Sequence, residues 1–151
     1  MLKYLNNKLI IVESGLIEKE TIIKRLVDLI FTNTKLLISK EQFLEKIFER
    51  EAIGTTGIGK GIAVPHARCE GLTDIVMAIG VVKTGVEFNT PDDEKAKVIL
   101  LVGAPKEKND EYLDILASIS KAFRNKDFRN SIILASSVDE VVEITATMIE
   151  G

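Results

Sequence analysis

The sequence has one cysteine, no long hydrophobic run and no excess of charge of either sign, and each absence narrows what the chain can be. Cys69 is the single cysteine of 151 residues, so no disulfide forms within the chain. The first ten residues lack the long apolar run and small-residue cleavage site of a secretory signal. The longest apolar stretches, such as Ile75 to Val82, fall far short of the roughly 20 residues that span a bilayer. We expect a cytoplasmic protein that serves any membrane process as a soluble component.

Charge is nearly balanced along the chain. Lys and Arg total 20 against 23 Asp and Glu, for a formal charge of −3, and no segment concentrates basic residues. A protein that binds nucleic acid through phosphate contacts needs a basic stripe, so we expect no nucleic-acid partner. Apolar residues make up 46% of the chain, enough for a full core at this length. No linker or repeat divides the sequence, so we expect a single domain over residues 1–151.

Segments with strand-like apolar runs alternate along the chain with segments whose apolar residues have helical spacing, and this alternation predicts the fold class. Short apolar runs rich in β-branched residues predict strands at residues 9–12, 62–64, 74–83 and 97–102. Apolar residues at helical spacing predict helices at residues 18–33, 39–51, 110–124, 127–135 and from 137 onward. Residues 97–102 are apolar in succession, as in a strand that is covered on both faces. We therefore expect an α/β domain with a central mixed β-sheet flanked by helices on both faces.

The predicted helices carry start signals and apolar stripes. Ser39 and Ser137 open two of them as capping boxes, in which the serine hydroxyl accepts from the backbone and Gln42 or Glu140 reaches back. The stripe expected to face the core in helix 110–124 comprises Leu113, Leu116, Ala117, Ser120 and Phe123, and that in the last helix comprises Val141, Val142, Thr145, Met148 and Ile149.

The densest local signal is a glycine-rich segment followed by the one histidine of the chain. Residues 54–61 hold four of the ten glycines, so no stable helix forms there. A strand then runs to Pro65, and because proline lacks an N–H we expect the strand to leave the sheet there and to present His66 at its exit. A neutral imidazole has one lone pair for nucleophilic attack. A lone histidine is more often a surface or hydrogen-bonded residue, so that interpretation stays open on residue type alone.

Three other chemistries fit the same segment less well. Gly54 to Lys60 matches the first seven positions of the phosphate-binding P-loop, but Gly61 stands where Ser or Thr ligates Mg²⁺, and the segment leads from a helix into a strand. His66 and Cys69 supply two ligands where structural zinc takes four, so we expect no metal site. Cys69 has no nearby Gln or Asn to complete a thiol-protease arrangement, and a buried structural cysteine is the simpler interpretation.

The residues around His66 carry a family resemblance. Their pattern resembles the phosphorylation-site signature of enzyme IIA of the phosphoenolpyruvate-dependent sugar phosphotransferase system, in its fructose/mannitol type, which includes nitrogen-regulatory IIA proteins. The matching positions read Glu51-x₆-Ile58-Gly59-x₂-Ile62-Ala63-Val64-Pro65-His66-Ala67. The resemblance extends to the helix that ends in Glu51, to the Gly-Thr-Thr-Gly-Ile-Gly loop and to the closing Ser-Val-Asp-Glu-Val helix. It implies that the chain is one IIA domain.

The resemblance implies a phosphotransferase component that works through a phosphohistidine. His66 would take a phosphoryl group from the phosphocarrier HPr or a paralogue and pass it to a IIB component, which in turn serves a membrane permease. The family's arginine and loop threonine fall on Arg50 and Thr56, which would bind the phosphate charge together with backbone amides of the glycine-rich segment. By residue type alone, Arg50 is equally a solvated charge at a helix end and Thr56 a turn residue. No cofactor is implied, because the phosphate arrives on a protein.

The chain departs from the family at one position. Many members carry a second histidine at the start of the helix that follows the Val-Gly-Ala-Pro segment, and Tyr112 stands at the matching place here. Tyrosine donates a hydrogen bond to phosphate but does not become an imidazolium at neutral pH. The primary transfer needs only His66, and a half-buried helix residue is the alternative role for Tyr112.

Two functions stay open beside sugar transport. The first is a nitrogen-regulatory IIA protein, which controls partner proteins through the phosphorylation state of His66. The second, more remote, is a nucleotide-binding domain that uses the Gly54–Lys60 loop.

Overall fold

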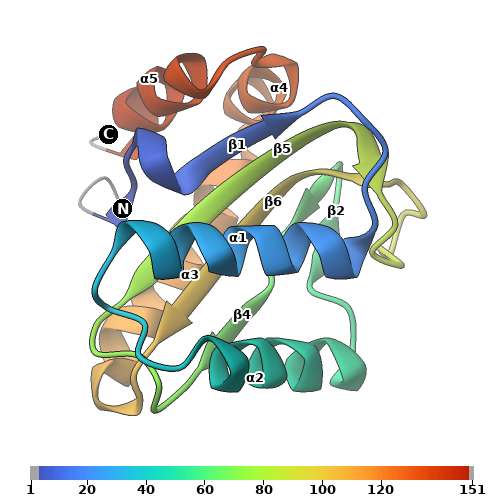
Figure 1. The fold of residues 1–151 in the computed structure, drawn as a ribbon. Coiled ribbons are helices and arrows are strands. Elements are labelled where there is room, and N and C mark those ends of the chain that lie inside the picture. The colour runs from blue at the N-terminus through green and yellow to red at the C-terminus, as the bar shows by residue number, and fades with distance from the viewer. Residues whose placement is uncertain (1–3, 150–151) are drawn as a thin grey trace.

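A six-stranded mixed sheet with helices on both faces forms the protein, and the computed structural model describes residues 4–149 (Figure 1). The strands are β1 (Ile10–Glu13), β2 (Gly57–Gly59), β3 (Ile62–Ala63), β4 (His66–Arg68), β5 (Val76–Val86) and β6 (Ala96–Ala104). The helices are α1 (Lys19–Asn33), α2 (Lys40–Ile53), α3 (Asn109–Arg124), α4 (Lys126–Leu134) and α5 (Val138–Ile149), and the short 3₁₀ turns η2 (Asn7–Leu9) and η3 (Lys106–Lys108) precede β1 and α3. The predicted fold class is confirmed. No helix in residues 4–149 is long and apolar enough to cross a membrane.

β5 and β6 form the centre of the sheet. They pair antiparallel along most of their length, with Ala78 opposite Leu101. β1 joins the other edge of β5 in parallel, and β3 and β4 join the other edge of β6 in parallel, so the order is β1-β5-β6-β3-β2 with β4 beside β6. Nearly every residue of the two central strands is buried on one face or the other, which explains why their sequences are mostly apolar.

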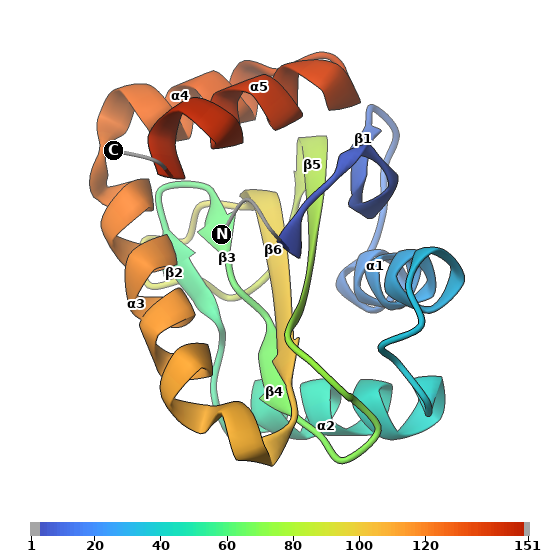
Figure 2. The same ribbon diagram turned by 90° about the vertical axis from the view of Figure 1, so that its left-hand side faces the viewer.

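Each face of the sheet carries its own core. α1 and α2 cover one face, where Ile22 and Phe43 are fully buried. α3, α4 and α5 cover the other face, where Ile119 and Val141 are fully buried. Figure 2 shows α1 and α3 on opposite sides of β5 and β6. The two cores hold the sheet rigidly, so a residue on a strand at the sheet edge has a fixed position relative to the helices.

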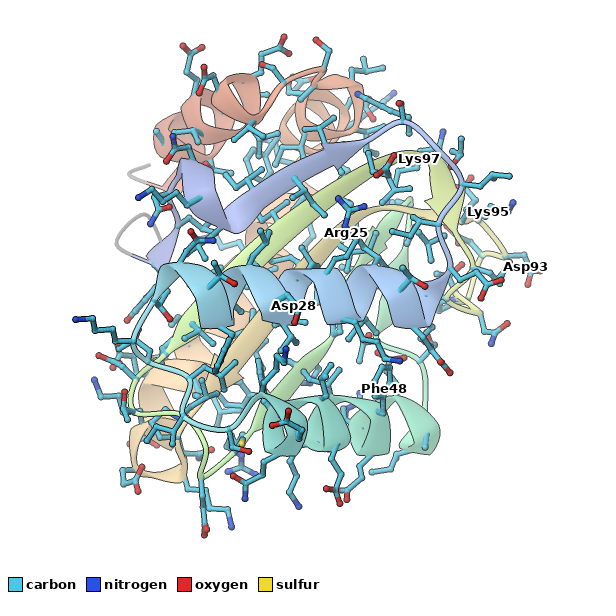
Figure 3. The ribbon with its side chains drawn as sticks, in the orientation of Figure 1. Arg25, Asp28, Phe48, Asp93, Lys95 and Lys97 are labelled. Atoms are coloured by element: carbon cyan, nitrogen blue, oxygen red, sulfur yellow. The ribbon has the colours of Figure 1, made fainter. Side chains whose placement is uncertain are left out.

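The outer face of α1 is charged. Arg25 and Asp28 are exposed on α1 (Figure 3); Arg25 pairs with Glu13 at the end of β1 at 2.7 Å, and Asp28 pairs with Lys40 at the start of α2 at 3.1 Å. Both pairs are solvent-exposed, so they add little to stability.

The hydroxyls of Ser39 and Ser137 cap their helices as predicted, whereas the predicted bond from the Glu140 side chain back to Ser137 does not form. Ser39 Oγ accepts from the Gln42 N–H and Ser137 Oγ from the Glu140 N–H, each at 3.2 Å. The Glu140 carboxylate accepts from the backbone and hydroxyl of Ser136 instead of returning to the capping serine. In the stripe predicted for α5, Val141 and Thr145 are buried and Val142 is half-buried, while the side chains of Met148 and Ile149 lie outside the described residues.

The inward face predicted for α3 is confirmed at Phe123, and its other four residues are displaced by about one position. The buried residues are Tyr112, Ile115, Ile119 and Phe123, whereas Leu113, Ala117 and Ser120 are exposed and Leu116 is half-buried. Two neighbouring stripes of this helix are apolar, and contact with β6 selects the one that carries the larger rings and β-branched side chains. Leu113 and Leu116 are therefore left at the protein surface.

The glycine-rich segment folds as a β-hairpin. β2 and β3 pair antiparallel, and Gly59, Lys60 and Gly61 turn between them with positive φ angles of 89°, 57° and 84°. The Lys60 N–H donates to Asp92 Oδ2 at 2.7 Å. A P-loop needs a strand before it and a helix after it. The glycine-rich segment instead follows helix α2 and continues into strand β3. The segment does not have P-loop architecture.

The expected departure of the strand at Pro65 is wrong. Ala63 faces Ile99 and His66 faces Val102, so β3 and β4 follow β6 in one register on both sides of the proline. Pro65 lacks a donor, but its carbonyl still accepts from the Val102 N–H at 3.0 Å. The loss of one donor at a sheet edge interrupts the ladder without ending it. His66 therefore lies inside the edge of the sheet and not at its exit.

Gly103 of β6 is the glycine at which space is tightest. A Cβ there would lie 2.4 Å from Phe43 Cζ and 2.8 Å from Leu72 Cδ1, both in buried side chains. We predict that Gly103→Ala lowers the free energy of unfolding by about 1–3 kcal/mol, the range typical of overpacking, measured by urea denaturation. Gly54→Ala is the control, because no atom lies within 4 Å of its Cβ position. Equal effects of the two changes would contradict the prediction.

Candidate active site

His66 is oriented by a hydrogen bond to the backbone two residues earlier. Its Nδ1 lies 2.6 Å from the carbonyl oxygen of Val64. Because a carbonyl only accepts, Nδ1 carries the proton, and the lone pair of the neutral ring is on Nε2. Val64 is held in turn by its own N–H, which donates to the Thr56 carbonyl at 3.0 Å. The ring thus has a defined tautomer, and Nε2 is the nitrogen able to attack.

The surroundings of His66 keep the ring neutral. Partial burial is the main cause that lowers its pKa below the ordinary 6.5, and the Arg50 guanidinium lowers the pKa further. The hydrogen bond to Val64 and the negative charge of Glu51 act in the opposite direction without reversing the shift. A neutral imidazole at physiological pH is the form required of a nucleophile.

A surface pocket of about 530 Å³ surrounds His66. Its lining residues come from α2, β4, η3 and the first turns of α3, and Figure 2 shows β4 beside α2. Within residues 4–149, the charged side chains that line it are Lys46, Arg50, Arg68 and Lys106, against Glu49. The pocket is therefore basic although the chain as a whole is slightly acidic. Such a site attracts an anion.

Arg50 lies in the last turn of α2 and lines the same pocket as His66. Its Nη1 donates to the carbonyl of Gly54 at 2.7 Å, which satisfies an acceptor at the helix C-terminus. A guanidinium has five N–H groups, so this one bond leaves donors for an anion. The bond also fixes the side chain, so the charge is held in place before any ligand arrives.

Tyr112 packs against His66. The two ring centroids lie 6.3 Å apart with the ring planes tilted by 54°. Burial raises the pKa of Tyr112 to about 12, with smaller opposing effects from Arg68 and Arg50. The phenol is therefore protonated at every physiological pH, and it lines the pocket as a permanent hydrogen-bond donor.

Thr56 lies beside the pocket, not in its lining. Its side chain is buried, and its hydroxyl donates to Glu51 Oε1. The glycine-rich turn is also separate, because Gly59 and Lys60 line a different depression of the surface. The structure thus brings His66, Arg50 and Tyr112 together, and it places Thr56 behind them with its one hydroxyl proton directed at a carboxylate.

Several residues of the pocket were not predicted as site residues; Arg68, close to His66 in the sequence, was interpreted as a solvated charge. Arg68 is two positions after His66 in the same strand, so both side chains lie on one face of the sheet, and this spacing is a signal that the sequence did contain. The Arg68 guanidinium donates to Asn109 Oδ1 at the start of α3. Lys106 and Leu113 enter the pocket through the tertiary fold, and no local pattern predicts their place.

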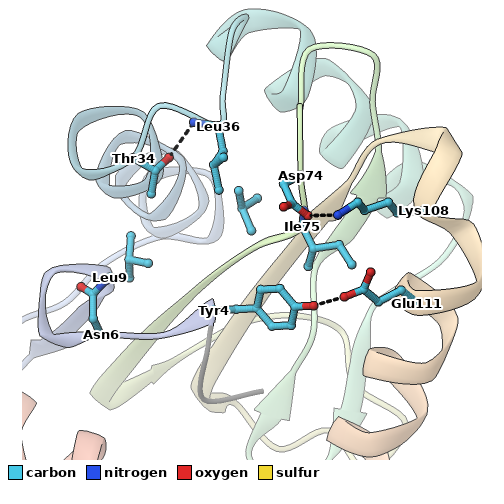
Figure 4. A pocket seen from close by; sticks show the side chains of 10 residues that line it. Tyr4, Asn6, Leu9, Thr34, Leu36, Asp74, Ile75, Lys108 and Glu111 are labelled. Atoms are coloured by element: carbon cyan, nitrogen blue, oxygen red, sulfur yellow. Dashed lines mark hydrogen bonds and ion pairs between the residues drawn. The ribbon is translucent and has the colours of Figure 1, made fainter.

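A second pocket, of about 280 Å³, lies near the N-terminal segment and the start of α3 (Figure 4). It contains none of the predicted site residues. Tyr4 donates to Glu111, and Lys108 pairs with Asp74 at 2.8 Å, so its polar groups are bonded to one another. Cys69 is buried elsewhere, and burial raises its pKa, which disfavours a nucleophilic thiolate.

Comparison with known proteins places the chain among related sequences. A family model described as "Phosphoenolpyruvate-dependent sugar phosphotransferase system, EIIA 2" matches residues 3–147. The fructose-specific EIIA component of Haloferax volcanii is 29% identical over 111 residues, which cover 74% of this chain and 72% of that protein. A nitrogen regulatory protein of Klebsiella oxytoca is 30% identical over 110 residues, which cover 71% and 67%. The fructose-specific EIIABC component of Bacillus subtilis is 30% identical over 127 residues, which cover 84% of this chain but only 20% of that longer protein.

Solved structures share the fold. The nitrogen regulatory protein IIA-Ntr of Neisseria meningitidis superposes with a TM-score of 0.85 and 27% identity, over 95% of this chain and 97% of that chain. The mannitol enzyme IIA of Escherichia coli, solved in complex with phosphorylated enzyme IIB, gives a TM-score of 0.79 at 21% identity, over 95% and 97%. The likeness to the mannitol protein is one of fold.

We predict that His66 titrates below pH 6.5, because burial and Arg50 disfavour its charged form. As the one histidine of the chain, it gives a single set of ring signals in ¹H–¹⁵N NMR, which report both its pKa and the protonated Nδ1. Below pH 6.5 the unfolded chain binds the proton first, so the free energy of unfolding should fall as the pH falls through this window. His66→Gln should remove that part of the pH dependence. A titration at or above 6.5 would contradict the prediction.

Proposed function

The chain belongs to the EIIA 2 family of the phosphoenolpyruvate-dependent sugar phosphotransferase system, and we propose on this premise that it is a phosphoryl carrier whose acceptor is Nε2 of His66. The observation that carries the proposal is the free lone pair of a neutral, fixed imidazole inside a basic pocket. HPr or a paralogue is the proposed donor, and a IIB component is the proposed recipient. A cytoplasmic location is part of this proposal, because the carrier has to meet both partners inside the cell.

The transfer is a direct displacement between two imidazoles. Nε2 of His66 attacks the phosphorus of the donor phosphohistidine, a new N–P bond forms, and the N–P bond of the donor breaks with its electron pair returning to the donor ring. Positive charge develops on the ring of His66 as the bond forms. The Val64 carbonyl, which already accepts from Nδ1, stabilises that charge without any movement.

Three side chains are placed to bind the oxygens of the phosphoryl group. Arg50 supplies charge-assisted hydrogen bonds from the end of α2, and Arg68 adds positive charge from β4. Tyr112 supplies a neutral donor in place of the second histidine of many relatives. We propose that the tyrosine binds the phosphate but takes no part in proton exchange, since its proton does not leave at physiological pH.

The rim of the pocket suits a protein donor. Ile53 at the end of α2 is 85% exposed and Leu113 on α3 is 52% exposed, and both line the pocket. Large exposed apolar side chains around a polar centre are typical of protein contact surfaces. We propose that HPr and the IIB component dock in turn on this rim, which brings their active residues to the same nucleophile.

A regulatory role is the second candidate. Its support is the likeness to nitrogen regulatory proteins, at 30% identity in sequence and a TM-score of 0.85 in structure. The first chemical step is the same in both functions, and only the recipient differs. A protein that binds the chain according to the phosphorylation state of His66, in place of a IIB acceptor, would favour the regulatory role.

Incubation with phosphoenolpyruvate, enzyme I and HPr should add one phosphoryl group to the protein, and intact-mass analysis should detect it. The modification should be acid-labile, because an N–P bond is labile in acid. His66→Gln should keep the fold and gain no mass, since the glutamine amide keeps the polarity without a nucleophilic nitrogen. Absence of phosphorylation with several HPr proteins that phosphorylate a control IIA protein would contradict the proposal.

Loss of the charged donors of Arg50 should slow phosphoryl acceptance by His66 more than loss of the single neutral donor of Tyr112. Arg50→Met should slow phosphoryl acceptance roughly 10- to 100-fold, the loss expected for charge-assisted hydrogen bonds. Tyr112→Phe removes one neutral donor and should slow acceptance roughly 2- to 10-fold. Rapid-quench kinetics with phosphorylated HPr measures both rates. If Tyr112→Phe matched the wild-type rate, the hydroxyl would have no role in binding phosphate.

A further inference from the structure

An ion pair lies behind the pocket, outside the residues that line it. Lys19 Nζ at the first residue of α1 lies 2.7 Å from Glu51 Oε2 in the last turn of α2. The Glu51 side chain is only 5% exposed and that of Lys19 26%, so the pair is largely shielded from water. The ammonium group of Lys19 also lies 4.7 Å from the centroid of the Phe88 ring. A carboxylate this buried needs a partner, and Lys19 supplies the countercharge.

A continuous series of contacts joins this pair to the nucleophile. Glu51 Oε1 accepts from the hydroxyl of Thr56. The carbonyl of Thr56 accepts from the N–H of Val64 at 3.0 Å, and the carbonyl of Val64 accepts from Nδ1 of His66 at 2.6 Å. Every contact in the series is a short polar one, and its last member fixes the tautomer of the nucleophile.

We propose that Lys19 is a positioning residue of the phosphorylation site, which acts through Glu51 and Thr56 on the backbone that orients His66. This inference rests on the proposed function of His66. Lys19 has two effects. It fixes the carboxylate that receives the Thr56 hydroxyl, and it neutralises a negative charge that would otherwise repel the incoming phosphoryl group.

The effect of the Lys19–Glu51 pair on the pKa of His66 can be measured separately from the effects of the other charges near the ring. The charged or titratable groups that line the pocket with His66 are Arg50, Glu49 and Lys46 of α2, Arg68 of β4, Lys106 of η3 and Tyr112 of α3, and Glu51 of α2 acts on the ring from outside the lining. Glu51 raises the pKa of His66, opposite to Arg50. With Lys19 removed, the carboxylate loses its countercharge, so its upward effect on that pKa should grow.

The test compares Lys19→Met with the double variant Lys19→Met/Glu51→Gln. Lys19→Met should slow phosphoryl acceptance from HPr roughly tenfold, as expected when a nucleophile is held less accurately, and should raise the pKa of His66 in ¹H–¹⁵N NMR. The double variant removes both charges but keeps an acceptor for Thr56, so it should recover most of the rate and return the pKa toward the wild-type value. A change in the pKa of His66 in a folded Lys19→Met variant, reversed by Glu51→Gln, is not expected of a lysine that only stabilises the fold.

Arg25→Met is the matched control. Arg25 lies on the same helix and pairs with Glu13 at the same 2.7 Å, but the pair is exposed and touches no residue of the series. It should leave both the rate and the His66 signals unchanged. Thermal melts of all variants show whether a slow variant is folded.

The outcomes separate this inference from the proposed function. Wild-type phosphorylation with unchanged His66 signals and rate in folded Lys19→Met would overturn the role of Lys19 and leave the carrier function intact. A double variant as slow as Lys19→Met would also overturn it. No phosphorylation of the wild type would overturn the carrier function, whereas the NMR comparison of the unphosphorylated variants would still decide whether Lys19 orients His66.

Discussion

The hydrogen bond from Nδ1 of His66 to the Val64 carbonyl is the contact on which the site depends. It spans only three residues, and Pro65 between them restricts the backbone that joins donor and acceptor. The pairing of Pro65 and His66 with Val102 of β6 then fixes this tripeptide against the two cores of the sheet. Because a local contact orients the ring and the sheet sets its location, no mobile segment is needed to place His66.

Most of the fold follows from local sequence signals. Apolar runs and serine caps predict the strands and helices, since burial on one or both faces produces those patterns directly. The face of α3 is different, because two adjacent apolar stripes fit a helix equally well and only contact with β6 decides between them. The sequence also failed to predict that pairing with β6 continues beyond Pro65, for a related reason. A proline removes one donor, and whether a strand continues depends on the neighbouring strand, which in this case lies 36 residues further along the chain.

Some features of the candidate site also follow from local sequence, whereas others depend on tertiary contacts. Arg50 directly precedes the motif that contains His66, so both residues could be identified from one short segment of sequence. The choice of Nε2 as the free nitrogen depends on a backbone carbonyl, which carries no signal in the sequence. Thr56 was expected in the pocket by position, yet its hydroxyl donates to Glu51, because a buried carboxylate near it requires donors. Lys106 and Leu113 come from segments that only the tertiary fold brings to β4.

The position of β4 has a consequence for how other chains can approach. Within the described residues β4 pairs with β6 alone, so its second side is a sheet edge, and such edges recruit strands from other molecules. β4 is only three residues long, it follows a proline and it carries Arg68, three features that discourage backbone pairing. The same short strand that carries His66 therefore discourages edge-to-edge aggregation. Partners are therefore left to recognise the side chains around β4 and not its backbone.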